Sequence, residues 1–364
     1  MRPVAETESP SRQRPGAAPP LLRFQDARIT ESSGLAVSSR KSAVLFTHND
    51  SSDEPRFFAV DRQGQTLRSY RVSGAQARDW EDMASVAGAE GPALWFADTG
   101  DNRGRRPEVV LYRVAEPAVP ASPDGTGTAE PVVPATAFRV RYSDRPHDVE
   151  ALLVQPGTEQ IHLVTKTPTG VSDVYALPSR LDATAINVAR PVAQVTYRPT
   201  GTPGGPVGGL GQLATTGGAV SADGRFLALR TYTDAYIWPV PDDDVPAALS
   251  AAPTVLPLPR TRQGEAITFD ADGRQLLTSS EGPQAPVHAV SVAGAAASGS
   301  TGQLPGAATP TASQEATRRP GSPGSTGFRL PEVAGALGLA GILVVAGSIA
   351  AVRRLRRRAQ QRRR

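Results

Sequence analysis

The sequence contains no cysteine, only two lysines (Lys41 and Lys166), and few aromatic residues, which make up 5% of its 364 positions. The lack of cysteine excludes disulfide-stapled folds, thiolate metal sites and cysteine nucleophiles. Aromatic residues are scarce, whereas glycine and proline number 35 and 34. This balance favours an all-β domain with many turns, flanked by segments that do not pack into a core.

Positive charge is concentrated at one end of the chain. The formal net charge is +4, but eight arginines lie in residues 353–364, so the rest of the chain carries −4. A mildly acidic globular part repels polyanions. We therefore expect no nucleic acid among the partners of this protein.

One long hydrophobic run extends over residues 333–352. It contains no charged residue, and Ser348 is its only polar side chain. At about 1.5 Å per residue such a helix spans roughly 30 Å, the thickness of a bilayer core. The arginine-rich tail, 353–364, follows directly, and tails of this kind remain in the cytoplasm. The sequence predicts a single-pass transmembrane helix over 330–352 that anchors the chain in the cell membrane, with the preceding chain outside.

The two segments that flank the predicted domain are polar. Residues 1–20 are rich in proline and lack the apolar core of a signal peptide, so we expect disorder here and a signal that is missing from this start. Residues 293–329 consist mostly of Ala, Gly, Ser, Thr and Pro, which predicts a flexible stalk. The folded domain is expected at 21–292.

A three-strand theme recurs within 21–292. The first strand starts with an acid followed by small or apolar residues, the second is apolar with a polar end, and the third is again apolar. The spacing from the acid of the first strand to the polar end of the second strand is regular. It is 17 positions from Glu31 to His48 and 17 positions from Glu81 to Asp98. The acid-to-polar-end distance is 16 positions in two later repeats, from Glu150 and from Glu265. Recurrence at a fixed register, with SADG and DADG turns, predicts the blades of a β-propeller.

Five blades can be counted, with a sixth left open in residues 180–213. The fifth repeat has only three strands, and residues 21–27 form a short strand with no other role. We expect this N-terminal strand to complete the last blade and close the ring, because an unfilled blade exposes unpaired backbone groups.

The innermost strands of a propeller line its channel, so their starting acids should meet at one mouth. The polar ends of the second strands should join them. Gly218 is expected to take the place of the acid in the fourth repeat. The predicted ligand-binding set is Glu31, His48, Asp50, Glu81, Asp98, Asp101, Glu150, Lys166, Arg230, Glu265 and Glu281.

Carboxylates that converge repel one another unless a cation neutralises them. Oxygen ligands without cysteine favour Ca²⁺ or Mg²⁺ over zinc, and the candidate metal ligands are Glu81, Asp98, Glu150 and Glu265. In the alternative interpretation, each acid caps backbone amides or pairs with an arginine of its own blade. The segment Asp98-Thr-Gly-Asp-Asn-Arg103 lacks EF-hand spacing and fits loop capping better.

Four strings carry a resemblance to known proteins: THNDS (47–51), DWEDMA (79–84), FADTGDNRGRRPEVVLYRVAEP (96–117) and GEAITFDADGRQLLTSSEG (264–282). They resemble an exported bacterial family of WD40-like β-propellers, and more distantly the phytase-like propellers. The distant resemblance implies calcium bound at strand starts and phosphoester hydrolysis, carried here by Glu81, Asp98, Asp101, Glu150 and Glu265. This sequence has no dense Lys/Arg phosphate clamp beyond Lys166 and Arg230, which argues against phytase activity.

The sequence as a whole therefore predicts an extracytoplasmic propeller that acts as a binding or scaffolding module. Its expected partner is an extracytoplasmic protein or a small molecule. The alternative function is a Ca²⁺-dependent phosphoesterase or esterase. Neither a G-x-S-x-G motif nor a phosphate-binding glycine loop is present to support other nucleophilic or nucleotide chemistry.

Overall fold

A computed structural model describes residues 19–51, 53–123 and 129–292. The predicted stalk (293–329), the predicted transmembrane helix (330–352), the arginine tail (353–364) and most of the N-terminal segment lie outside the described residues. Within the described ranges, no helix has the length and apolar character that a membrane crossing requires.

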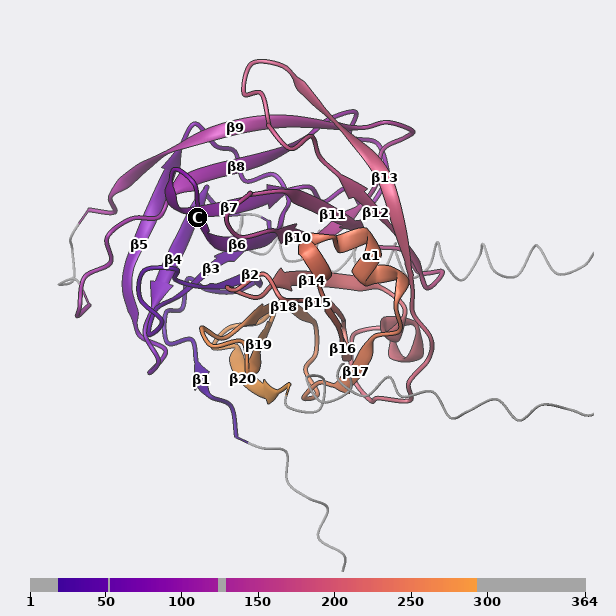
Figure 1. Cartoon of the computed structure of the whole chain (residues 1–364). Coiled ribbons are helices and arrows are strands. Elements are labelled where there is room, and N and C mark those ends of the chain that lie inside the picture. The colour runs from indigo at the N-terminus through magenta and orange to yellow at the C-terminus, as the bar shows by residue number, and fades with distance from the viewer. Residues whose placement is uncertain (1–18, 52, 124–128, 293–364) are drawn as a thin grey trace, which may run out of the picture. The chain divides into compact units, whose positions relative to one another are not determined.

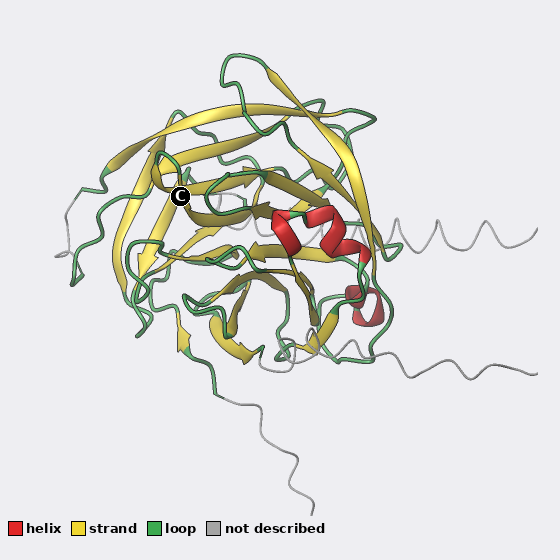
Figure 2. Ribbon diagram, viewed as in Figure 1, coloured by secondary structure: helices red, strands yellow, loops and turns green. Residues whose placement is uncertain are grey.

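Twenty strands dominate the described chain, and they form five four-stranded blades (Figures 1 and 2). Blade 1 contains β2 (Ser32–Val37), β3 (Leu45–Asn49), β4 (Arg56–Val60) and β5 (Thr66–Ser73). Blade 2 contains β6 (Trp80–Gly88), β7 (Gly91–Asp98), β8 (Val109–Ala115) and β9 (Val132–Tyr142). Blade 3 contains β10 (Val149–Val154), β11 (Ile161–Thr165), β12 (Val171–Ala176) and β13 (Ile186–Thr196). Blade 4 contains β14 (Thr215–Val220), β15 (Phe226–Thr231), β16 (Asp234–Pro239) and β17 (Thr254–Pro257). Blade 5 contains β18 (Gly264–Phe269), β19 (Gln275–Ser280), β20 (Pro286–Ser291) and the N-terminal β1 (Leu22–Arg23).

The first strand of each blade lies at the centre of a closed ring. β2 lies against β6, β6 against β10, β10 against β14, β14 against β18, and β18 returns to β2. Within each blade the strands run antiparallel outward from this centre. The architecture is a five-bladed β-propeller, as the repeats predicted, and residues 180–213 contribute β13 and a loop rather than a sixth blade.

Among the described residues, helical structure is limited to short segments. The single α-helix among the described residues, α1 (Val245–Ser250), is capped by the Asp244 side chain, which accepts a hydrogen bond from the Ala247 amide. It follows the 3₁₀ turn η2 (Pro241–Asp243) and packs beside β13 and β16. A second 3₁₀ turn, η1 (Gly208–Gln212), lies in the glycine-rich connection before β14.

Apolar side chains gather in five clusters, one at each seam between neighbouring blades. Successive residues of a strand point to opposite faces of its blade, and both faces are covered by a neighbour. In β10, for example, Leu152 and Val154 pack toward blade 2, whereas Ala151 and Leu153 pack toward blade 4. The inner strands therefore read as continuous apolar runs rather than as an alternating pattern.

The ring closes through the N-terminal strand. Leu22 and Arg23 of β1 pair with Val287 and Pro286 of β20, which confirms that the N-terminal segment completes the fifth blade. Leu22 and the next apolar residue, Phe24, are buried in the cluster between blades 5 and 1. The first and last strands of the domain are thus hydrogen-bonded neighbours.

The outer strands form an additional connection that the repeat pattern did not predict. β9 pairs in parallel with β5 at residues 132–134 and with β13 at residues 139–142. Both contacts use the ends of unusually long strands, since β9 and β13 each span 11 residues. Blades 1, 2 and 3 are consequently joined into one twelve-stranded sheet, which curves around the upper part of Figure 1.

Candidate site at the propeller mouth

Each inner strand begins with a register shift that aims one side chain at the mouth. In blades 1 to 4, one extra residue is inserted in the inner strand directly after its first paired residue, and in blade 5 Glu265 and Ala266 lie opposite the single Ser279. Bulges of this kind bend a strand and redirect a side chain. The residues in these bulges include Glu81, Glu150 and Glu265, so the carboxylates of three blades are presented at the same end of the ring.

The bulges also correct the predicted equivalences between blades. Blade 1 has Ser33 at the inserted position, so Glu31 lies two residues earlier than expected. Blade 4 has Thr216 there, because Thr215 pairs with Thr231 and Gly217 with Arg230. The prediction that Gly218 replaces the acid was therefore wrong by two positions, since a period-two pattern does not locate an inserted residue.

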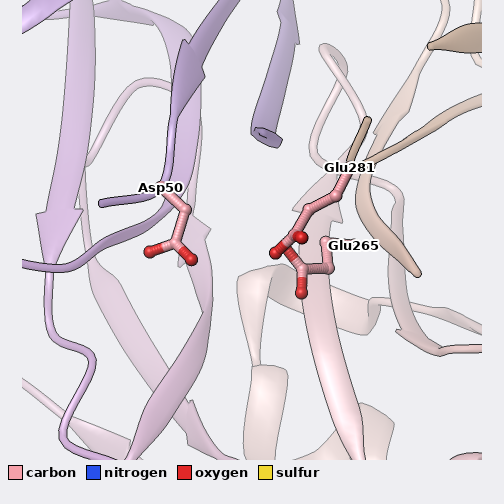
Figure 3. A group of neighbouring side chains, drawn as sticks. All are labelled: Asp50, Glu265 and Glu281. Carbon is pink, nitrogen blue, oxygen red and sulfur yellow. The ribbon is translucent and has the colours of Figure 1, made fainter. Parts of the chain in front are cut away.

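Seven carboxylates meet at the mouth in three overlapping groups, and within each group the ligand oxygens lie within 4.8 Å of one another. The first group joins blades 1 and 5 and is shown in Figure 3, where Asp50 faces Glu265 and Glu281. Asp50 also belongs to the second group, and Glu81 belongs to the second and the third. The three groups are Asp50, Glu265 and Glu281; Asp50, Asp79 and Glu81; and Glu81, Asp148 and Glu150.

Burial divides these acids into an inner and an outer set. Asp50, Glu81, Glu150 and Glu265 are at most 1% exposed, whereas Asp79, Asp148 and Glu281 are partly exposed. We call the four buried acids the floor. Two floor atoms, Glu150 Oε2 and Glu265 Oε2, have no hydrogen-bond partner among the described residues. Buried carboxylate oxygens are normally hydrogen-bonded, so these two could serve as ligands of a metal ion.

Lys166 is the one ammonium group that contacts a floor carboxylate within the described ranges. Its Nζ lies 2.7 Å from Glu150 Oε1 and 5.3 Å from the centre of the Tyr232 ring. Burial alone would lower the pKa of Lys166, but the carboxylates of Glu150, Glu265 and Asp148 raise it well above its ordinary value. Lys166 is therefore charged at neutral pH, and it neutralises one of seven acids.

Arg230, the second predicted basic residue, lies buried beneath the mouth rather than in it. Its guanidinium donates hydrogen bonds to the carbonyls of Thr231, Ala266 and Ser279. Burial lowers the pKa of Arg230 to about 10, although the charge of Glu265 opposes this. A Cβ on Gly264 would lie 2.0 Å from Arg230 Nη2, so glycine leaves the room that the guanidinium fills.

Asp98 and Asp101 brace a loop and belong to none of the three carboxylate groups. Asp98 forms a buried ion pair of 2.8 Å with Arg106 and accepts a hydrogen bond from the Asp79 amide. Asp101 accepts a hydrogen bond from the Arg106 amide, while its own amide donates to Asp148 Oδ1 at 2.7 Å. The structure thus favours loop capping for this segment, and it pairs the candidate metal ligand Asp98 with an arginine.

His48 and Glu31 also differ from their predicted surroundings. The His48 ring packs edge-on against Trp80 and Phe96, and burial lowers its pKa to about 4, so it is neutral in a largely aromatic environment. Glu31 forms a backbone bridge with Glu281 and is partly exposed. The close carboxylate groups of the described chain include neither residue.

Three acids outside the predicted ligand-binding set also lie near the ring centre. Asp79 and Asp148 lie two residues before the bulged Glu81 and Glu150, and the repeated D-x-E spacing of blades 2 and 3 was the available signal. Burial and the neighbouring Glu150 raise the pKa of Asp148 to about 7. The third, Asp82, is considered separately because it faces away from the mouth groups.

Asp82 ties three blades together. Its Oδ2 accepts hydrogen bonds from the amides of Leu152 in β10 and Gly218 in β14, and its Oδ1 accepts one from Met83. Burial raises the pKa of Asp82 well above its ordinary value, although these three donors oppose the shift. Asp82 therefore fixes the relative positions of the inner strands that carry Glu81 and Glu150.

Comparison with known proteins adds little to this geometry. No family model matches the sequence, and a comparison with curated proteins finds no match. Solved structures that resemble the chain include U3-55K, with 14% identity, 69% of this chain and 73% of that chain covered, and a TM-score of 0.35. The WD40 repeats of RRP9 show 13% identity, coverage of 71% and 80%, and a TM-score of 0.36. XC5397 from Xanthomonas campestris, described as a gluconolactonase, shows 17% identity, coverage of 70% and 72%, and a TM-score of 0.36.

At such low identities and TM-scores these likenesses carry no argument about activity. The fold assignment rests instead on the strand pairing of the five blades. The resemblance to one exported bacterial family stays a prediction from the sequence strings.

Proposed function

We propose that this protein is a binding module whose propeller mouth holds a divalent cation, Ca²⁺ by its ligand chemistry, and uses it to bind a ligand. The observation that supports this most directly is that two buried oxygens, Glu150 Oε2 and Glu265 Oε2, have no hydrogen-bond partner among the described residues and that each belongs to a close group of three carboxylates. Ca²⁺ takes six to eight oxygen ligands in flexible geometry, and carboxylates are its usual protein ligands.

Electrostatic repulsion gives a second reason. The mouth gathers seven carboxylates, and Lys166 pairs directly with one of the four floor acids, Glu150. Like charges within a few ångströms disfavour ionisation of the whole set unless a cation is bound. Glu150 shares its group with Glu81 of blade 2, and Glu265 shares its group with Asp50 of blade 1, so a cation in either group would also join two blades.

Thermal unfolding of the full-length chain tests the proposal. Ca²⁺ bound only by the folded state adds about 2.7 kcal/mol at a hundredfold excess over Kd, so millimolar Ca²⁺ should raise the Tm by several degrees. Glu150→Gln should abolish the rise. Glu116→Gln is the matched control, because Glu116 is equally buried but accepts hydrogen bonds from Ser38, Ser39 and Ser85 at the opposite end of the ring. An unchanged Tm of the wild type in Ca²⁺ would refute the cation site.

A second candidate function, Ca²⁺-dependent hydrolysis of a phosphoester or ester, is favoured by one observation. Asp148 has its pKa raised to about 7 and belongs to the same carboxylate group as Glu81 and Glu150. A carboxyl group with this pKa exchanges protons at neutral pH, which suits a general acid or base. Turnover of a generic phosphoester or ester in Ca²⁺, lost in Asp148→Asn while Ca²⁺ binding is kept, would establish the enzyme; absence of turnover leaves the binding module.

We also propose that the propeller is held outside the cell membrane by a single helix. The support is the uncharged run 333–352 followed by eight arginines. Protease added to intact cells should release the propeller by cleavage within 293–329. Full protection of the domain in cells that express it would contradict this topology.

A further inference from the structure

Exposed arginines surround the acidic mouth. Inner strands begin at the mouth, so the loops that precede them, and those that follow the second strands, lie at the same end of the ring. Arginines on five of these loops are exposed and form no ion pair with a described carboxylate. We call the following seven the rim arginines: Arg78, Arg103, Arg105, Arg145, Arg198, Arg260 and Arg262.

Three acids at this end of the ring have partners other than the rim arginines. Glu54 lies near Arg56 and Arg71, Glu108 lies near Arg139 of β9, and Asp144 accepts hydrogen bonds from His147 and Tyr175. The rim arginines are thus positive charges that form no ion pair with these acids. The mouth has a negative floor inside a positive rim.

We propose that this end of the propeller binds a flexible linear polyanion, a chain with sulfate, phosphate or carboxylate groups on successive units. The rim arginines lie on separate loops from the β5–β6 connection to the β17–β18 connection, so one small anion cannot contact them all. A chain with repeated anionic groups can contact several, and each further contact is made at high effective concentration. Guanidinium groups bind such oxyanions through paired hydrogen bonds.

The floor sets a condition on this binding. A polyanion that approaches seven carboxylates is repelled unless a cation lies between them. Ca²⁺ at the floor would remove this repulsion and offer open coordination positions to the anionic groups. This step rests on the proposed function, and it predicts that the polyanion binds more tightly when Ca²⁺ is present.

The surface argues against single-stranded nucleic acid as the polyanion. Proteins that bind such strands stack the bases on exposed aromatic rings. Every Trp and Tyr in the described ranges is buried, and among the described Phe residues only Phe226 is partly exposed. The rim thus offers charge without a stacking surface, which suits a chain recognised through its anionic groups alone. The mildly acidic net charge of the chain outside its arginine tail, which argued against polyanions, does not describe this end of the molecule.

Fluorescence anisotropy of a labelled dextran sulfate with the full-length protein at low salt and millimolar Ca²⁺ tests the proposal. Arg103→Gln with Arg105→Gln, and separately Arg260→Gln with Arg262→Gln, should each weaken binding about tenfold and reduce its salt dependence. The matched control is Arg225→Gln with Arg274→Gln. These two arginines are exposed in the turns at the opposite end of the ring, beside Asp223 and Asp272. An equal loss in rim and control variants would overturn the proposal.

The same binding assay with other ligands identifies which chemical groups are recognised. Dextran sulfate should bind more tightly than an equal amount of monomeric sugar sulfate, and neutral dextran should not bind. Carboxylated and phosphorylated chains compared with the sulfated chain identify the preferred anionic group. Tighter binding of a single-stranded oligonucleotide than of dextran sulfate at equal charge would overturn the proposal in favour of nucleic acid.

Failure of the two proposals can be distinguished. If Ca²⁺ binds in calorimetry but dextran sulfate does not, the rim proposal is wrong and the cation site stands. If dextran sulfate binds through the rim arginines equally well in Ca²⁺ and in chelator, and Ca²⁺ alone shows no binding, the rim proposal stands and the cation site is wrong. The full prediction is an affinity at least tenfold higher in Ca²⁺ than in chelator.

Discussion

Phe24 should contribute more to the stability of the ring than its position near the N-terminus suggests. Its ring is 0% exposed and lies among apolar residues of blades 5 and 1, whereas Leu21, three residues earlier, is 43% exposed. Truncation of a buried phenylalanine to alanine costs about 3–5 kcal/mol, the transfer of the ring plus the cavity that it leaves. Natural domains are stable by only about 5–15 kcal/mol, so Phe24→Ala should remove a large part of the total.

The assay is thermal unfolding of the full-length chain, followed by tryptophan fluorescence, with Leu21→Ala as the matched control. For a domain of this size, 1 kcal/mol corresponds to about 2–4 °C in Tm, so Phe24→Ala should lower the Tm by roughly 6–20 °C. Leu21→Ala should stay within about 0.5 kcal/mol of the wild type, as exposed sites do. Equal midpoints for the two variants would show that the N-terminal strand does not close the ring in solution.

Three further predictions concern the mouth and the inner strands. Lys166→Met leaves Glu150 buried without its ammonium partner, so the variant should lose about 3–5 kcal/mol in chelator and regain stability in Ca²⁺; equal Tm values in both buffers would contradict this. Because the pKa of Asp148 is raised to about 7 in the folded state, its contribution to stability is present at pH 4 and is lost as the pH rises through 7. Asp148→Asn should therefore flatten the pH dependence of Tm between pH 4 and 8 in chelator, and an unaltered profile would argue against the shift. A Cβ on Gly217 would lie 2.4 Å from a backbone carbonyl of β18, whereas one on Gly209 meets nothing within 4 Å; Gly217→Ala should lower the Tm clearly and Gly209→Ala should not.

The blade count and the closure of the ring could be predicted because they depend on spacing and on unpaired backbone. Repeated acid-to-polar-end intervals defined the blades, and a three-stranded last repeat required a fourth strand from elsewhere. The pairing of Leu22 with Val287 confirms that argument. The parallel contacts of β9 with β5 and β13 left no sequence signal, because they arise where long outer strands happen to extend past their own blades.

The candidate site was predicted in part, and the errors have a common cause. Asp50, Glu81, Glu150, Glu265 and Glu281 are distributed over the three close carboxylate groups, and their role in binding a ligand stays a prediction. The bulge that directs Glu81 and Glu150 toward the mouth also shifts the strand register by one residue. Comparison of the repeat sequences therefore treated Glu31 as the equivalent of Glu81, whereas Ser33 occupies that position. Whether a polar residue at a strand end points to the mouth depends on this local geometry.

The polar ends of the second strands also show that spacing does not predict side-chain surroundings. His48 and Asp98 occupy similar places in their strings, yet one packs against aromatic rings and the other pairs with Arg106. Neither outcome follows from spacing, because each depends on a side chain supplied from another part of the chain. Asp82 is similar, since its donors come from β10 and β14.

The ladder that joins the outer strands makes the five seams mechanically unequal. Strand pairing through β9 crosses the seams between blades 1 and 2 and between blades 2 and 3. Among the strands of residues 19–292 that the structure describes, no ladder crosses the seam between blades 3 and 4 or between blades 4 and 5. Blades 1 to 3 should therefore move together as one rigid body, whereas blades 4 and 5 can each move separately. A circular permutant opened at 74–79 or 143–148 would keep its new ends tethered by that ladder, whereas one opened at 197–214 would depend on side-chain packing alone. The position of the new termini should thus determine how readily the ring of a circular permutant opens.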